Sequence, residues 1–327
     1  MKTKLSVVLV AIAGQFIYSL PTKACTGITL KSKGETTIVA RTIEWGGSNL
    51  NSQYVIVPRG HTEQSYTPDG MNGMTFTSRY GYGGFAVEEK EKSISDLQLV
   101  SWILGKCKTV DEVKEAVKKV RIINIDPRAS TVHWRFTDTS GHQLVLEIIN
   151  GVPEFYENKL GVLTNSPGFE WQLTNLNNYV NLFPGTAPAQ HLGNIELSSF
   201  GAGSGFLGIP GDVTPPSRFV RAAFYQTSAP QQDTPLKTVL QCFQILNNFD
   251  IPVGIEFKPG EVPCDIPSAT QWTSATDMTN RIIYFRTMYN SAIRSIDLNT
   301  IDFTKVHYQA KPMDIAKQQP VETIKIK

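Results

Sequence analysis

The chain has 327 residues, of which 31 are basic and 29 acidic, and its formal net charge at pH 7 is +2. This length fits one large α/β or α+β domain or two modest ones. The small net charge excludes the strongly basic surface typical of nucleic-acid-binding proteins, and no segment after residue 24 is long and apolar enough to span a membrane.

The first 24 residues have the pattern of an export leader. Two lysines open it, an apolar run follows at 5–13, and the small residues Thr22 and Ala24 stand at positions −3 and −1 of a cut before Cys25. The alternative, a retained membrane helix, is disfavoured because the run is short for a span of roughly 20 apolar residues. We therefore expect a signal peptide at 1–24, a single domain at 25–327, and a periplasmic or secreted protein.

Removing the leader changes the charge balance. Taking 24 residues from 327 leaves 303, and taking three leader lysines from 31 basic residues leaves 28 against 29 acidic ones, a net charge of −1. The excess of positive charge thus belongs to the leader, and the mature chain gives no electrostatic reason to bind nucleic acid.

The spacing of the four cysteines, Cys25, Cys107, Cys242 and Cys264, matches neither a zinc site nor a dense disulfide framework. Cys107 and Cys242 lie in helix-like apolar surroundings and are expected to be buried, unreactive thiols. No metal triad emerges from the five histidines, which we interpret as structural or surface residues. No cofactor is expected.

Cys25 directly follows the predicted cut, and three interpretations compete. The cysteine can stand there by chance, it can carry the lipid of a lipoprotein, or it can be an N-terminal nucleophile. TKAC is a poor lipoprotein signal, because Lys23 occupies a position for a small residue. A free α-amino group, with a pKa of about 8, can take the proton of a thiol with a pKa of about 8.5, so one residue supplies nucleophile and base.

Residues 25–44 predict a β-hairpin with its turn at 32–34. A turn centred on Lys33 places Cys25 opposite Arg41, whose guanidinium favours the thiolate. Glu44, just past the strand end, is positioned to hold an ammonium group at the N-terminus.

The rest of the chain predicts helices and strands in consecutive groups. Helices are expected from Ser95 to Gly105 and from Thr109 to Val120, and then at 173–180, 217–227 and 235–249; strands are expected at 131–137, 142–149, 152–157, 280–288 and 292–298. Ser140-Gly141 and Asn150-Gly151 mark tight turns. Because strands and helices are not strictly alternating, the pattern favours antiparallel sheets with helices packed on them, an α+β fold.

Four stretches together resemble the choloylglycine hydrolase family, which includes bile salt hydrolases and penicillin V acylases. They are CTG at 25–27, ART at 40–42, GVLTNSPGFEWQLTNLNNY at 161–179 and GIPGDVTPPSRFVRAAF at 208–224. The resemblance implies an N-terminal nucleophile hydrolase with a four-layer αββα sandwich of antiparallel sheets.

The same resemblance implies roles for five residues. Cys25 is similar to the nucleophile, Arg41 to the arginine beside it, and Glu44 stands where many members have Asp. Asn165 is similar to the asparagine that helps to bind the oxyanion, and Arg218 to a second arginine of the site.

One segment departs from the family pattern. Between Tyr80 and Ser95 roughly thirty residues of that pattern are absent, which exceeds ordinary loop variation, and neither Tyr80 nor Tyr82 can be assigned as a second oxyanion partner.

The family resemblance implies hydrolysis of conjugated bile salts, with penicillin V or other N-acyl amides as alternative small-molecule substrates, and a homo-oligomer, a tetramer by resemblance. The rival class is a lipid-anchored binding protein of weak activity on the same fold.

Overall fold

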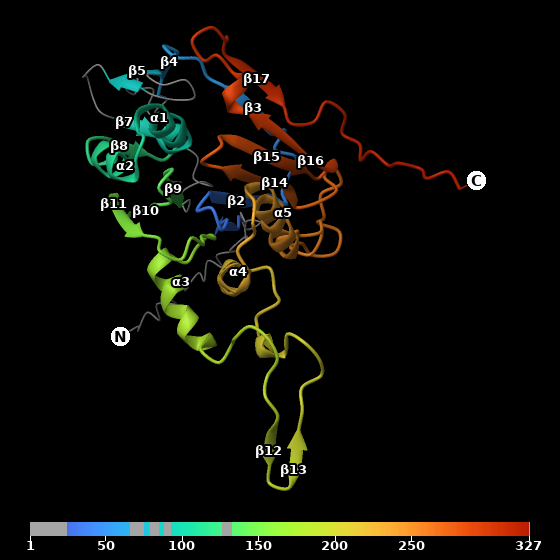
Figure 1. Ribbon diagram of the computed structural model, residues 1–327. Helices are drawn as coiled ribbons and strands as arrows, with labels where there is room; N and C mark the ends of the chain where they lie inside the picture. Colours follow the sequence, from blue (N-terminus) through green and yellow to red (C-terminus); the bar gives the residue numbers. More distant parts are fainter. Residues whose placement is uncertain (1–24, 66–74, 79–84, 88–92, 126–132, 327) are drawn as a thin grey trace, which may run out of the picture.

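Figure 1 presents a computed structural model of the chain, which describes residues 25–65, 75–78, 85–87, 93–125 and 133–326. The predicted leader and the tyrosines at 80 and 82 lie outside the described residues. No helix in the described part of the chain is long and apolar enough to cross a membrane.

A five-stranded antiparallel sheet forms the centre of the molecule (Figure 1), in the order β1-β2-β14-β15-β16. Its strands are β1 (Gly27–Lys31), β2 (Thr37–Glu44), β14 (Thr270–Asp277), β15 (Ile282–Thr287) and β16 (Asn290–Asp297). The first and last thirds of the chain therefore meet at the pairing of β2 with β14.

One face of the central sheet is covered by two helices, α4 (Pro215–Ser228) and α5 (Pro235–Leu246). Ile28 and Ile38 of the sheet are fully buried in one cluster with Phe219 and Val239 of these helices. Burial of such side chains stabilises each by roughly 1.5–3 kcal/mol, so this layer fixes the β1–β2 hairpin in place.

A second, three-stranded antiparallel sheet has the order β11-β10-β9. Its strands are β9 (Trp134–Thr137), β10 (Gln143–Ile149) and β11 (Val152–Glu157). Leu144 and Leu146 point to the cluster formed with α1 (Leu99–Lys106) and α2 (Val110–Val117), while Gln143 bonds to Thr29 of β1. This sheet therefore lies between two helices and the central sheet.

The remaining strands form small sheets. They are β17 (Gln309–Pro312) with β3 (Gln53–Ile56), β4 (Thr62–Gln64) with β5 (Thr75–Ser78) and β6 (Phe85–Val87), β7 (Ser93–Ser95) parallel to β8 (Arg121–Ile123), and β12 (Gln190–Leu192) with β13 (Ile195–Leu197). In Figure 1 the β12–β13 hairpin extends far from the rest of the molecule.

The sequence predicts this mixture of helices and antiparallel sheets, including tight turns at 140–141 and 150–151 that adopt positive φ at Gly141, Asn150 and Gly151. One helix begins earlier than expected: α3 (Phe169–Asn175) precedes a 3-10 turn at Leu176–Tyr179. The Phe169 nitrogen donates to the buried carboxylate of Glu147, and an anion at this end stabilises a helix.

Candidate active site

Cys25 lies at the entry to β1 with its sulfur bound by an arginine. Arg41 Nη2 donates to Cys25 Sγ at 3.1 Å. The next residue, Thr26, is fully buried, and its oxygen accepts from Thr42 N at 2.9 Å, so the ladder between the two strands continues almost to Cys25. The structure therefore places the Arg41 guanidinium in direct contact with the Cys25 sulfur.

The predicted register of the hairpin is wrong by two residues. Arg41 pairs with Gly27, not with Cys25. The cause is a longer loop: Ser32 N donates to Thr36 O, and Glu35 takes a positive φ of 61°. Because side chains alternate with a period of two, a shift of two keeps Cys25 and Arg41 on the same face of the sheet.

Asn165 and Arg218 meet at the backbone of Cys25. The Cys25 nitrogen donates to Asn165 Oδ1 at 2.7 Å, and Arg218 Nη2 donates to the same oxygen at 3.0 Å. Arg218 Nη1 also donates to the Cys25 carbonyl oxygen at 2.8 Å and to Thr26 Oγ1 at 2.7 Å. Both donors go to Oδ1, so the amide nitrogen of Asn165 takes no part in these bonds.

Glu44 ends β2 and is almost fully buried, at 1% exposure. Neither carboxyl oxygen has a hydrogen-bond partner among the described residues. Burial raises the pKa of this carboxyl to about 8, although the positive charges of Arg218 and Arg41 oppose the rise. The hydrogen bond of the Cys25 nitrogen goes to Asn165 and not to Glu44.

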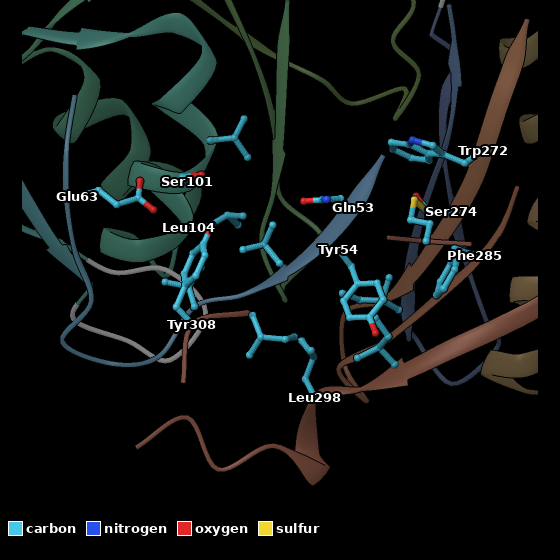
Figure 2. A pocket seen from close by; sticks show the side chains of 17 residues that line it. Gln53, Tyr54, Glu63, Ser101, Leu104, Trp272, Ser274, Phe285, Leu298 and Tyr308 are labelled. Atoms are coloured by element: carbon cyan, nitrogen blue, oxygen red, sulfur yellow. The ribbon is translucent and has the colours of Figure 1, made fainter. Parts of the chain in front are cut away.

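A cavity of about 380 Å³ lies on the same face of the central sheet as Arg41. Arg41 pairs with Ser274, which lines the cavity, and its guanidinium lies 5.4 Å from the ring centre of Trp272, which also lines it. Figure 2 shows Trp272, Ser274 and Phe285 on one side and Leu104, Tyr308 and Glu63 on the other. Its volume is in the range of about 300–1,000 Å³ typical of small-molecule sites.

The other candidate residues of reactive type lie apart from this site. Cys242 is buried, which raises the pKa of its thiol, and partial burial raises that of Cys107 to about 11. His133 lies 2.6 Å from a Glu147 oxygen and His142 2.6 Å from a Glu157 oxygen. No group of His, Cys, Asp and Glu suited to a metal ion occurs in the described residues.

Sequence reasoning missed the residues that β14 supplies. Trp272 and Ser274 belong to no recognised motif, and their strand was not predicted. The available signal was alternation: Thr273 and Ala275 are buried against the helices, whereas Trp272 and Ser274 face the other way.

Comparison with known proteins identifies relatives of this chain. Residues 63–310 match the family model described as linear amide C-N hydrolases, choloylglycine hydrolase family. The chain is 34% identical to the bile salt hydrolase/transferase of Clostridium perfringens, over 76% of this chain and 78% of that protein. It is 24% identical to the penicillin V acylase of Pectobacterium atrosepticum, over 85% and 73%.

A solved structure with a similar fold is also known. A cysteine-to-alanine variant of the conjugated bile acid hydrolase of Clostridium perfringens superposes with a TM-score of 0.73 at 26% identity, covering 92% of this chain and 100% of that one. The protein is thus an enzyme, a hydrolase acting on linear amide C–N bonds. The chain belongs to the choloylglycine hydrolase family.

Proposed function

We propose that this protein is an exported hydrolase that uses Cys25 to cleave the amide bond of glycine- or taurine-conjugated bile salts. The observation that carries the proposal is the Arg41–Cys25 contact of 3.1 Å on the sheet face that also bounds an apolar cavity. The conjugated bile acid hydrolase and bile salt hydrolase named above support the substrate class.

Acylation begins after the leader is cut. The α-amino group of Cys25 accepts the thiol proton, and the thiolate forms a bond to the amide carbonyl carbon. The Asn165 amide donates to the negative oxygen that develops, a kind of contact whose loss elsewhere costs about 10²–10³ in rate. The C–N bond then breaks, and the α-ammonium group returns its proton to the leaving amine, which leaves a thioester on Cys25.

Deacylation repeats these steps with water. The free α-amine takes a proton from a water molecule as the water oxygen bonds to the thioester carbon. When the C–S bond breaks, the acid departs, and the α-ammonium group returns its proton to the sulfur, which restores the Cys25 thiol. Arg218 contributes by holding the Cys25 carbonyl and the Asn165 oxygen in one arrangement.

The cavity supports the proposal that the substrate has a bulky apolar acyl group. Its lining is mainly aliphatic and aromatic, contributed by β3, α1 and strands β14–β16. Burying apolar area there stabilises a complex by about 25 cal/mol per Å². Penicillin V and other N-acyl amides remain the alternative substrates, and the penicillin V acylase relative favours them.

A side-by-side kinetic comparison tests the substrate. Mature enzyme is incubated with glycocholate, taurocholate and penicillin V, and the released amines are quantified against Cys25→Ser. We expect faster turnover of the bile salts. Cleavage of penicillin V alone would reassign the enzyme within its family, and no cleavage of any amide would reject the proposal.

Export and cleavage before Cys25 belong to the same proposal, because the chemistry needs a free amine. Intact mass of the secreted protein measures both. A mass matching residues 25–327 supports the proposal. A mass raised by a lipid would favour the membrane-anchored binding protein instead, since acylation blocks the amine.

We further infer an αββα order of layers, supported by the two separate cores around α4–α5 and α1–α2, and a homo-oligomer. The projecting β12–β13 hairpin supports self-association, since its large apolar side chains are solvent-exposed: Leu192 68%, Ile195 62% and Leu197 48%. An isolated two-stranded hairpin is at best marginally stable in water. Light scattering of wild type against a Leu192→Asp/Ile195→Asp variant tests this: a smaller assembly for the variant supports it, and equal masses reject it.

A further inference from the structure

Arg135 on β9 directs a guanidinium between the two main sheets. Its strand neighbours Trp134 and Phe136 pack into the α1–α2 core, so Arg135 faces the central sheet. Arg135 Nη1 donates to the Gly161 carbonyl oxygen at 2.9 Å, and Nη2 donates to the Ala40 carbonyl oxygen at 3.3 Å.

This guanidinium lies directly against Gly27 of β1. A Cβ atom at position 27 would stand 3.0 Å from Arg135 Cζ, a close contact that would require the guanidinium to move by a few tenths of an ångström. Glycine leaves room for the guanidinium where it stands.

No acid neutralises Arg135 within the described part of the chain. The groups that act on its charge are Arg41, which repels it, and the Cys242 thiol, and burial lowers the pKa of Arg135 to about 9. Placing an unpaired guanidinium between sheets is costly, because desolvation is offset only by hydrogen bonds. A hydrophobic side chain would fill the space at less cost, so its presence calls for another explanation.

The positions of its contacts supply that explanation. Ala40 directly precedes Arg41, Gly27 is two residues after Cys25, and Gly161 is four residues before Asn165. The same segments are joined by a reciprocal backbone pair, Gly27 N to Leu163 O at 2.8 Å and Leu163 N to Gly27 O at 3.1 Å. Arg135 thus touches three of the four segments that carry candidate active-site residues. The fourth is α4, which carries Arg218.

We propose that Arg135 is a positioning residue that ties these three segments together next to the proposed nucleophile. The proposal rests on the proposed function of Cys25. Arg135 orients Cys25, Arg41 and Asn165 through their backbones and contacts no substrate.

The charged groups around Cys25 determine what a pH profile reports. Arg41 contacts the sulfur, Arg218 contacts the Cys25 backbone, and Glu44 interacts electrostatically with both arginines. Replacing Arg135 leaves every one of these direct contacts to Cys25 chemically intact. A change in the reactivity of the Cys25 thiol on that replacement therefore reports a change in position.

The test compares Arg135→Met, Arg135→Lys and a matched control, Arg294→Met, in mature enzyme carrying Cys264→Ser. Arg294 is also half-buried and bonds a backbone carbonyl, Met313 O, but it lies on β16 at the opposite edge of the central sheet. The readouts are the iodoacetamide alkylation rate of Cys25 against pH, kcat and KM on one substrate, and the melting temperature.

We expect Arg135→Met to lower kcat by about 10²-fold with little change in KM, as small misplacements do, and to slow the alkylation of Cys25. Arg135→Lys should recover part of both losses, and Arg294→Met should change neither. A folded Arg135→Met enzyme with wild-type kcat and an unchanged alkylation profile would overturn the proposal.

Two features keep the test decisive. Alkylation of Cys25 needs no substrate, so it separates failure of this proposal from failure of the proposed function. If Arg135→Met does not fold, Gly27→Ala replaces it, since a methyl group there requires the guanidinium to move by a few tenths of an ångström. That variant should show the same loss of kcat and the same slowing of alkylation, and wild-type values for both would also refute the positioning role.

Discussion

The central sheet face that looks away from α4 and α5 differs between its two ends. At the β1–β2 end the second sheet covers it closely, with Thr29 Oγ1 donating to Gln143 Oε1 at 3.0 Å and Arg135 bonded to Ala40. At the β15–β16 end Phe285 and Ile283 face the cavity that β3 and α1 close from the other side. The proposed nucleophile, Cys25, lies at the filled end, where its neighbours are fixed, and the room for a ligand lies at the open end.

The difference indicates a division of labour across one surface. Trp272 and Arg41 stand between the two ends, with the guanidinium 5.4 Å from the indole ring centre. Rigid contacts preorganise reacting groups, whereas an apolar hollow contributes binding energy with little geometric demand. Changes at the filled end should therefore act on kcat, and changes at the open end on KM.

The largest effect is expected from replacing Cys25, the proposed nucleophile at the filled end. Cys25→Ser should lower hydrolysis by at least about 10³-fold, because the hydroxyl is far harder to deprotonate than the thiol. Circular dichroism should show the fold retained. Substantial turnover by the purified variant, measured by amine release, would remove Cys25 from the mechanism.

A second change at the filled end removes the hydrogen bonds that Arg218 donates around Cys25, the proposed nucleophile. Arg218→Met leaves the Cys25 carbonyl and Thr26 Oγ1 without their Arg218 donor, whereas Asn165 Oδ1 keeps the Cys25 nitrogen. Each of the two unsatisfied groups costs about 1–3 kcal/mol, so we expect chemical denaturation to report a loss of about 2–6 kcal/mol, with a fall in kcat. Arg294→Met is the control, and equal losses in both would mean that the effect is not specific to the site.

Glu44 predicts how the stability of the filled end depends on pH. Its pKa is about 8 in the fold against an ordinary 4.5. Between these values the folded protein holds a proton that the unfolded chain releases, so the unfolding free energy falls as pH rises from 4.5 to 8, by up to about 1.4 kcal/mol per unit. Glu44→Gln should flatten this part of the stability curve. The same slope in variant and wild type, from urea titrations at pH 5, 6, 7 and 8, would contradict the buried neutral acid.

The smallest expected effect concerns the open end. Ser274→Phe should fill part of the cavity, and blocking about 80 Å² of apolar contact removes about 2 kcal/mol of binding, or about 30-fold in KM. The increase should appear with a bulky acyl amide and be absent with an N-acetyl amide, while kcat stays unchanged. Ile293→Phe, on the partly exposed part of β16, is the control. A kcat effect without a KM effect would reverse the assignment of the two ends.

The sequence predicts the filled end better than the open one. Cys25, Arg41, Asn165 and Arg218 lie in distinctive motifs, and the structure brings all four together. The register was wrong by two because the loop at 32–36 is longer than the turn residues suggest, yet the faces were right because two is the period of a strand.

The open end could not be predicted because it depends on contacts distant in sequence. Strand β14 reads TQWTSATD, with one large apolar residue and small polar ones that resemble a loop. Burial of Thr273 and Ala275 against helices reveals it as a central strand. Propensity is a weak guide for such strands, since neighbours decide their stability.

The hydrogen bond from the Cys25 nitrogen to Asn165 forms while that nitrogen still belongs to a peptide bond. An amide nitrogen holds no lone pair for a proton, so in this state the thiol has no base of its own. Under the proposed mechanism the chain would fold as a zymogen, kept inactive by the one peptide bond that precedes Cys25. A protease would then set the moment of activation, and no domain movement would be required to release it.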